Sequence, residues 1–330
     1  MRDSLKRICD EYIKNYEAVR KEVKHEAISY VYPLGAYIFT ANGKTADPEV
    51  IKKCKQIVKE NAGTLSAFRG NAHAPTVCML AVSSDPESEI KSALEYNKML
   101  SAVFGSSDHF AGLSLMMKRL EASCKAEDLI TRGKEIFDAV KKKHRFVTGA
   151  EDAVMSVLLA LKNRTPEQVV EETEKIMAEL KPYGDTNAVQ TAAQVLAVSD
   201  MPTEEKCSRF KALFDGLRER GRKYSKNLSI AMLAGAAVLD ADVNTLLDDI
   251  CAVDDELAQQ TPYKGTFTGF NKSERLMHSA MLLSLDYCSE GSDYMTAISN
   301  VTTMFVTNEI VTLSILMADS ALVATILSVT

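Results

Sequence analysis

The chain has 330 residues, of which 46% are hydrophobic and 25% are charged, and its formal net charge is −6. This mixture is typical of a globular protein that is long enough to bury a large core or to form an array of repeats. The acidic balance argues against a general attraction to nucleic acid or to an anionic membrane.

The seven cysteines are widely scattered and form no CxxC pair. This pattern does not fit a disulfide framework or a zinc site, and it suits reduced thiols in a cytoplasmic protein. The N-terminus lacks the apolar core of a secretory signal. We expect an amphipathic helix over residues 1–24 instead. Its apolar stripe is Leu5, Ile8, Tyr12, Tyr16 and Val19.

Similar helical hairpins recur along the chain between residues 33 and 305. Each has a helix rich in small residues, a turn with Asp, Thr or Pro, and a more charged helix. Matching positions lie about 36–45 residues apart, the size of helix-pair repeats. No Gly/Ser linker divides the chain. We therefore predict a single all-helical domain over residues 1–330 with about seven hairpins.

In the first hairpin, Gly35–Thr40 forms the apolar helix and the pair Asn42-Gly43 ends it. Asp47 then caps a charged helix over Glu49–Glu60. Because Asn-Gly is also a strong turn signal between strands, a β-hairpin over residues 34–46 is the alternative. The second hairpin spans about Asn71–Ala102 and the third about Asp108–Lys142.

The fourth hairpin, residues 144–184, is the clearest. Thr148 and Glu151 have the spacing of a capping box at the start of its first helix, and Thr165 and Gln168 have the same spacing at the start of its second. The connection between the two helices is short, so we expect them to pack antiparallel.

The fifth hairpin begins at Asn187, the sixth spans residues 227–259 and the seventh spans residues 271–305. The sixth contains Asp248-Asp249 and Asp254-Asp255-Glu256, which invite comparison with the aspartate-rich magnesium motifs of helical prenyl-diphosphate enzymes. The DDxxD spacing fails, because Ala252 stands where the last aspartate would be. We therefore interpret these acids as a solvated helix face.

An apolar helix is predicted over residues 306–330. Val311–Thr330 is nearly continuous apolar sequence and is long enough to span a membrane. Asp319 near its centre and the lack of flanking Lys or Arg argue against a span. We expect this helix to be buried in the protein or in the interface of a homo-oligomer.

Polar residues recur at the start of the first helix in several hairpins. Equivalent ends of stacked hairpins lie on one rim, so these groups are expected to converge there. The candidate ligand-binding residues are Arg69, Asn71, His73, Asp108, His109, Asp152, Asn187, Gln190 and Arg275. Alternatively, Asp108, Thr148 and Thr186 are simple helix caps. Capping explains His73, Asn187 and Gln190 less well.

Metal and cofactor signatures are weak. Zinc or manganese would suit a set of His, Asp and Glu side chains at these helix starts, but no HxxxH or HExxH spacing is present. That set is His73, Asp108, His109, Glu151 and Asp152. Neither a glycine-rich phosphate loop nor a GxSxG motif occurs. We predict no metal and no cofactor.

Four segments resemble an uncharacterised bacterial family, domain of unknown function family four thousand and three. They are NAGTLSAFRGN (61–71), HRFVTGAEDAVMSVLLAL (144–161), GDTNAVQTAAQVLAV (184–198) and FNKSERLMHSAMLLSLDY (270–287). The resemblance runs over nearly the whole chain. It implies a cytoplasmic, single-domain bacterial protein, and it adds no catalytic residue because no activity is established for the family.

We therefore predict an all-α protein of stacked antiparallel hairpins in an α/α superhelix, either an open solenoid or a closed ring. The leading functional hypothesis is a binding or scaffold protein that holds a peptide or small ligand on its concave face. The alternative is a helical-ring enzyme with a polar central site, for which hydrolysis is one reaction to consider. A third hypothesis is that the protein is a purely structural oligomer.

Overall fold

The computed structural model describes residues 1–23, 31–70, 72–121, 124–143, 149–162, 164–227, 229–264 and 270–288. Within these ranges the regular structure comprises fourteen α-helices and a short 3₁₀ helix, with no strand. The prediction of an all-α fold is confirmed. The β-hairpin alternative over residues 34–46 is wrong, because helix α2 occupies Val31–Ala41 and ends before the left-handed Gly43.

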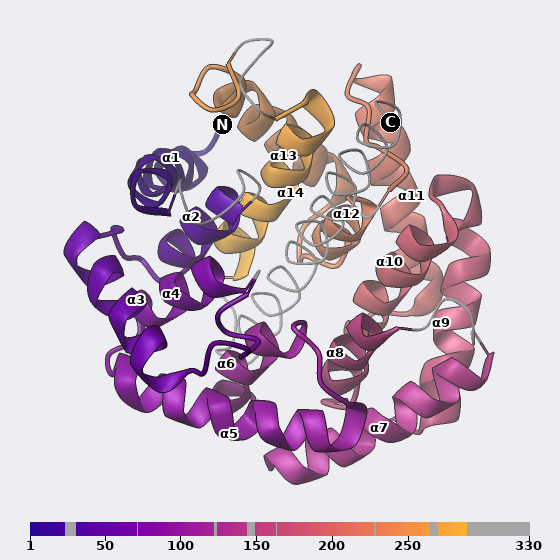
Figure 1. Cartoon of the computed structure of the whole chain (residues 1–330). Helices are drawn as coiled ribbons and strands as arrows, with labels where there is room; N and C mark the ends of the chain where they lie inside the picture. Colours follow the sequence, from indigo (N-terminus) through magenta and orange to yellow (C-terminus); the bar gives the residue numbers. More distant parts are fainter. Residues whose placement is uncertain are drawn as a thin grey trace, which may run out of the picture.

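The helices fall into two concentric sets (Figure 1). The outer helices are α1 (Asp3–Val23), α3 (Pro48–Asn61), α5 (Pro86–Phe104), α7 (Ala126–Lys143), α9 (Pro166–Leu180), α11 (Thr203–Glu219) and α13 (Val243–Ala258). The inner helices are α2 (Val31–Ala41), α4 (His73–Val82), α6 (Phe110–Leu120), α8 (Ala150–Leu159), α10 (Thr186–Val198), α12 (Ile230–Ala237) and α14 (Lys272–Cys288). The 3₁₀ helix, Lys181–Tyr183, follows α9.

The outer helices contact one another in chain order, and α13 returns to contact α1. The inner helix α14 likewise contacts both α12 and α2. The described helices therefore form a closed circuit, in which the two ends of the described chain lie side by side (Figure 1). Of the two arrangements that the sequence left open, these contacts favour the ring over the open solenoid.

The two sets of helices differ in composition for a physical reason. An outer helix such as α1 has a buried stripe that includes Tyr12 and Val19, and its other face is polar and exposed. In the inner helix α4, every residue from Ala74 to Val82 is buried. Successive helical residues point in different directions around the axis, so an inner helix must be apolar on all sides.

Local caps fix the helix boundaries. The predicted capping box at the start of α9 is confirmed: Gln168 Oε1 accepts from the Thr165 amide at 2.9 Å and Thr165 Oγ1 accepts from the Gln168 amide at 3.3 Å. The predicted cap Asp47 also accepts an amide of its own helix, that of Glu49, and Asp85 accepts the amide of Ser88 at the start of α5 in the same way.

Cations cap the other ends of several inner helices. Lys44 Nζ donates to the Val82 carbonyl at the end of α4, at 2.7 Å. The Arg209 guanidinium of α11 donates to the carbonyl of Ala237, the last residue of α12, and to those of Leu239 and Ala241 beyond it, each at 2.7 Å. The last carbonyls of a helix lack partners within the helix and carry negative partial charge, so a cation satisfies both needs.

Charged residues close the ring where α1 meets α13 and α14. Arg2 Nη2 lies 2.8 Å from Asp249 Oδ2 and 2.7 Å from Asp286 Oδ2. Both aspartates are buried. Tyr287 adds a hydrogen bond of 2.7 Å to Asp249. A buried carboxylate needs such partners, because an unpaired one would lose its hydration without compensation.

A buried hydrogen-bonded chain crosses the same seam. The hydroxyls of Tyr12 and Tyr263 lie 2.9 Å apart, and the Tyr263 hydroxyl lies 2.8 Å from His278 Nδ1 on α14. Burial lowers the pKa of His278 to about 3, because the charged imidazolium would be desolvated. His278 is therefore neutral, and its Nδ1 shares one hydrogen bond with the tyrosine hydroxyl.

Among the described helices, each outer helix packs mainly against the inner helix that follows it, from α1/α2 to α13/α14. The predicted hairpins, from α2/α3 to α12/α13, therefore follow the chain order of the helices but not their main contacts, and α8 packs against α7 more than against α9. The seventh predicted hairpin starts with α14, and its second half lies outside the described residues. The predicted apolar helix over 306–330 also lies outside them. Among the described helices, none is both long enough and apolar enough to cross a membrane.

Candidate functional site

Two adjacent inner helices bring together two of the predicted site residues. Asp152 is the third residue of α8, and Gln190 is on α10, the next inner helix. Asp152 Oδ1 accepts hydrogen bonds from Gln190 Nε2 and Gln194 Nε2, both at 2.8 Å. All three side chains are buried. We refer to Asp152, Gln190 and Gln194 as the carboxylate–amide cluster.

The other oxygen of Asp152 caps helix α8. Asp152 Oδ2 accepts from the Gly149 amide at 3.0 Å. The predicted capping pair of Thr148 and Glu151 is therefore displaced by one residue, with Gly149 at the cap position and Asp152 reaching back to it. Thr148 lies outside the described residues. Asp152 can fill this role and at the same time accept from the side-chain amides of Gln190 and Gln194 on α10.

The amide group of Gln190 has a fixed orientation with one unused atom. Its Nε2 faces the carboxylate, and turning the amide over would place a carbonyl oxygen against a negative charge. Oε1 therefore points elsewhere, and it is buried without a hydrogen-bond partner among the described residues. The side chain is only 3% exposed. An unsatisfied buried acceptor in a folded protein needs an explanation, and a missing ligand is one.

Two further inner helices carry unmatched hydroxyls. Thr76 Oγ1 on α4 and Ser114 Oγ on α6 are fully buried and have no partner within the described part of the chain. Helical Ser and Thr commonly donate to the carbonyl four residues earlier, as Ser156 does to Asp152 at 2.8 Å. The unmatched hydroxyls are therefore a departure from the usual local solution.

Thr76 and Ser114 were not among the predicted site residues, although their regular spacing is visible in the sequence. Thr76, Ser114, Asp152 and Gln190 follow one another at intervals of 38 residues. Each lies in the first half of an inner helix, from α4 to α10. A search for polar residues at a fixed period inside the apolar helices would have found this series.

The remaining candidates lie in other surroundings. His73 and His109 are half-buried, at the start of α4 and in the turn before α6. Asp108 and Asn187 are exposed. Arg69 is half-buried, and its Nη1 lies 3.5 Å from the Ala62 carbonyl. Asn71 lies outside the described residues.

The last candidate, Arg275, belongs to a buried ion cluster. Its guanidinium binds both oxygens of Asp254, at 2.7 and 3.1 Å, and Arg222 Nε lies 3.3 Å from the same carboxylate. Asp254 is buried, as is Asp249 at the ring seam. Our interpretation of the aspartate-rich segment as a solvated face is thus wrong for these two acids, because distant arginines neutralise them. Asp248 and Asp255 are exposed, as expected.

No metal centre can be assembled from the described residues. Nowhere among them do three His, Cys, Asp or Glu side chains come together in an arrangement that could hold an ion.

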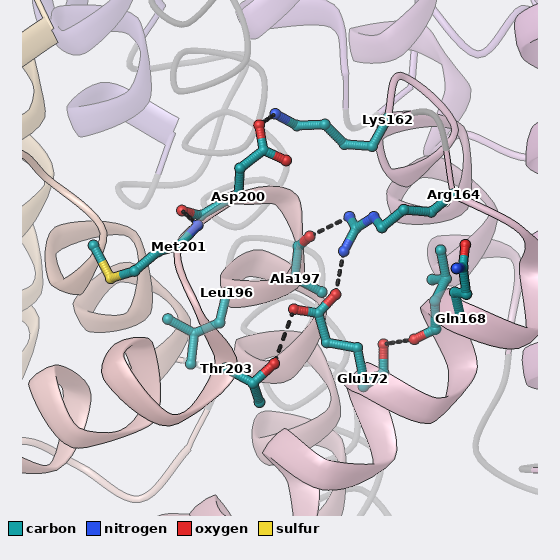
Figure 2. Close-up of polar contacts among 12 residues, drawn as sticks. Lys162, Arg164, Gln168, Glu172, Leu196, Ala197, Asp200, Met201 and Thr203 are labelled. Atoms are coloured by element: carbon teal, nitrogen blue, oxygen red, sulfur yellow. Dashed lines mark hydrogen bonds and ion pairs between the residues drawn. The ribbon is translucent and has the colours of Figure 1, made fainter.

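The opposite end of α10 holds a second charged group, of which Figure 2 labels Arg164 and Glu172. Lys206 of α11 is 0% exposed, and its ammonium donates to Glu172 Oε1 at 2.6 Å, to the Ser199 carbonyl at 3.0 Å and to the Leu196 carbonyl at 3.1 Å. All three ammonium protons are used. We refer to this group, together with Arg164, as the cation cap of α10.

Arg164 completes the cation cap. Its guanidinium binds both Glu172 and the Ala197 carbonyl (Figure 2). Thr203 Oγ1 lies 3.3 Å from Glu172, and Lys162 forms an exposed ion pair with Asp200 nearby. The arrangement joins α9, α10 and α11 through one carboxylate and two cations.

A family model described as "Protein of unknown function (DUF4003)" matches residues 15–314. The match covers well over half of the chain. The protein belongs to the DUF4003 family. The resemblance inferred from four sequence segments is thereby confirmed. No curated protein and no solved structure matches the chain.

Both ends of α10 lie inside the segment that matches DUF4003. Their chemistry differs. The cation cap binds the protein's own main chain and a carboxylate of its own, which is a structural role. The carboxylate–amide cluster of this DUF4003 chain offers one buried acceptor beside a carboxylate, which suits the binding of a hydrogen-bond donor.

Proposed function

We propose that this protein binds a small polar ligand at the carboxylate–amide cluster between α8 and α10. The observation that carries the proposal is the buried Gln190 Oε1, which has no partner among the described residues. The hydroxyls of Thr76 and Ser114 also lack a described partner, but they lie on α4 and α6 and are not part of this site. Leaving such groups buried and unsatisfied costs about 1–3 kcal/mol each.

A small ligand fits these observations better than a peptide. A peptide on a concave face would need an exposed groove along several helices, whereas Gln190 and Gln194 are both buried. A ligand of a few atoms can be enclosed between two helices, as small-molecule sites usually are.

Binding also fits better than catalysis. Asp152 is the strongest candidate for a general base, but its two oxygens already accept three N–H groups, from Gln190, Gln194 and Gly149. A base must reach the proton that it removes, and these donors occupy the positions from which it would do so. A helical-ring enzyme, of which a hydrolase is one form, therefore remains the second proposal.

We retain the other expectations from the sequence as part of this proposal. Six of the seven cysteines, those other than Cys288, are free thiols in the structure, which supports a cytoplasmic protein. The net charge of −6 supports a partner other than nucleic acid. A homo-oligomer through the apolar segment 306–330 is also retained, and light scattering of the chain with and without Val311–Thr330 would test it.

The test is a binding screen by saturation-transfer NMR on the full chain. The panel contains small polyols, amides, amines and carboxylates. We expect at least one class to bind the wild type and to lose binding in Gln190→Met, while Thr191→Ala on the exposed side of α10 binds normally. A panel in which nothing binds, or in which binding is unaffected by Gln190→Met, would overturn the proposal.

A further inference from the structure

The carboxylate–amide cluster combines a negative charge with an unpaired hydrogen-bond acceptor, and this combination restricts the class of ligand that it can bind. We propose that the ligand carries a protonated amine and that its ammonium donates to Gln190 Oε1 beside the Asp152 carboxylate. This inference rests on the proposed binding function and makes it more specific.

The first step concerns hydrogen-bond polarity. A carbonyl oxygen can only accept, so whatever satisfies Gln190 Oε1 must be a donor. The alternative amide orientation is excluded, because Gln190 Nε2 is held by Asp152 Oδ1 at 2.8 Å. Hydroxyl, amide and ammonium groups all meet this first requirement, and carboxylates do not.

The second step concerns charge. Oε1 and Nε2 belong to the same amide, so Oε1 lies within roughly 4–5 Å of the carboxylate that Nε2 contacts. A negative charge at that distance, in a buried site, favours a cationic donor over a neutral one. It also repels an anionic ligand.

The third step concerns the helix ends, which would otherwise favour an anion. The N-terminus of a helix attracts negative charge through its free amides and its dipole. Here the chain supplies that charge itself. Asp152 caps α8, and Asp185 caps α10 by accepting from the Ala188 amide at 2.9 Å. Asp185 is the N-cap of α10, where Thr186 was considered as the cap from the sequence. Neither helix end therefore calls for a bound anion.

The fourth step concerns the cations on neighbouring helices. Arg164 and Lys206 bind Glu172 and carbonyls at the opposite end of α10. They are committed to the cation cap and do not supply the donor that Gln190 Oε1 lacks. An ammonium from outside the chain meets the polarity and the charge of the site together.

The experiment compares three probes of equal length: 1,4-diaminobutane, 1,4-butanediol and succinate. Their affinities for the full-length protein are measured by saturation-transfer titration at pH 7 and 150 mM salt. We expect the diamine to bind at least tenfold more tightly than the diol, and succinate not to bind. Gln190→Met should weaken diamine binding at least tenfold, whereas Thr191→Ala should leave it unchanged.

Each contrary outcome has a distinct meaning. If the diol binds as tightly as the diamine, the amine inference fails and the binding function stands. If the diamine binds equally to Gln190→Met, it is held by the acidic surface and the inference fails. If no probe binds and the wider panel also fails, both proposals fall. Should Gln190→Met not fold, Gln190→Asn moves the same carbonyl back by one methylene and must show the same loss.

Discussion

Helix α10 meets polar partners at both of its ends, but the Lys206 ammonium at one end is fully paired, whereas the Gln190 amide at the other has an unused oxygen. At the C-terminal end, the ammonium of Lys206 has three acceptors: Glu172, Leu196 and Ser199. At the N-terminal end, Gln190 satisfies its amide nitrogen and leaves its carbonyl oxygen buried without a described partner. The contrast is between the Lys206 ammonium and the Gln190 amide; within the cation cap, Arg164 Nε is also buried without a described partner.

The difference separates a structural role from a binding role. A buried charge with all of its partners in the chain stabilises the packing of those partners and has nothing left to offer. A buried acceptor that lacks a donor destabilises the free protein and gains when a ligand supplies the donor. The comparison predicts large stability effects at the cation cap and small ones at the carboxylate–amide cluster.

The largest effect is expected from Glu172→Ala. This change removes the only described carboxylate that faces Lys206 and Arg164, so two cations remain in a mostly buried place without a counter-charge. Removing one partner of a buried pair typically costs about 3–5 kcal/mol. We expect a loss of that size in the free energy of unfolding, measured by urea denaturation.

Glu171→Ala is the matched control. Glu171 is adjacent on α9 and forms an exposed pair with Lys175 at 3.0 Å. Such pairs contribute about 0.3–0.5 kcal/mol. Equal losses in the two variants would show that the cation cap is not a buried unit.

The next effect concerns pH and the seam where the ring closes. Burial lowers the pKa of His278 from its ordinary value of 6.5 to about 3. Between these values the unfolded chain binds the proton and the folded chain does not, so stability is complete above pH 6.5 and declines as the pH falls. The expected slope is about 1.4 kcal/mol per pH unit. It is read from urea denaturation at pH 7, 6, 5 and 4.

His278→Phe is the comparison for that slope. Its absolute stability will differ because Tyr263 loses a partner. The relevant quantity is the slope of the free energy of unfolding against pH. In His278→Phe this slope should be smaller than in the wild type by about 1.4 kcal/mol per pH unit. Identical slopes would mean that His278 titrates outside the folded core. Like the Lys206 ammonium, this chain of hydrogen bonds has its partners within the protein, so its expected effect is on stability.

A third prediction asks whether the cation cap is general. Arg209 caps α12 as Lys206 and Arg164 cap α10, through three main-chain carbonyls. Hydrogen bonds to a charged group contribute about 1.5–3 kcal/mol, so Arg209→Met should lower the free energy of unfolding by about that amount. Arg218→Met, at an exposed position of the same helix, should change it by less than about 0.5 kcal/mol. A small loss of stability in Arg209→Met would mean that, of these two helices, only α10 is stabilised strongly by cations at its C-terminus.

The sequence predicted those features of the fold that depend on near neighbours. The capping box of Thr165 and Gln168 joins residues three apart, so its pattern is visible without the fold. The apolar and small residues of the inner helices likewise predict that these helices are buried on all sides. The same local rule misplaced the cap of α8 by one residue, because Glu151 and Asp152 both have acceptable spacing and only the contact with α10 distinguishes them.

Features that depend on distant partners could not be predicted. Asp249 is buried because Arg2, 247 residues away, reaches it across the seam. Lys206 is an ordinary lysine of a charged helix until the fold places Glu172 and two carbonyls around it. For the candidate site, residue type identified Asp152 and Gln190, but the pairing that makes them a site needs the contact between α8 and α10.

The smallest expected effect is the most informative test of the comparison. Gln190 and Gln194 donate to the same Asp152 oxygen at the same distance of 2.8 Å. Gln190→Met removes that hydrogen bond together with an unsatisfied carbonyl, so the two changes offset each other. Gln194 Oε1 is not among the buried atoms without a partner, and Gln194→Met therefore has no such compensation.

We expect Gln190→Met to change the free energy of unfolding by less than about 0.5 kcal/mol and Gln194→Met to lower it by about 1 kcal/mol or more. Urea denaturation of the two variants in the same buffer measures the difference directly. A larger loss in Gln190→Met would mean that the free protein already satisfies this carbonyl. The Gln190 amide would then be as fully paired as the Lys206 ammonium, and there would be no reason to expect a ligand there.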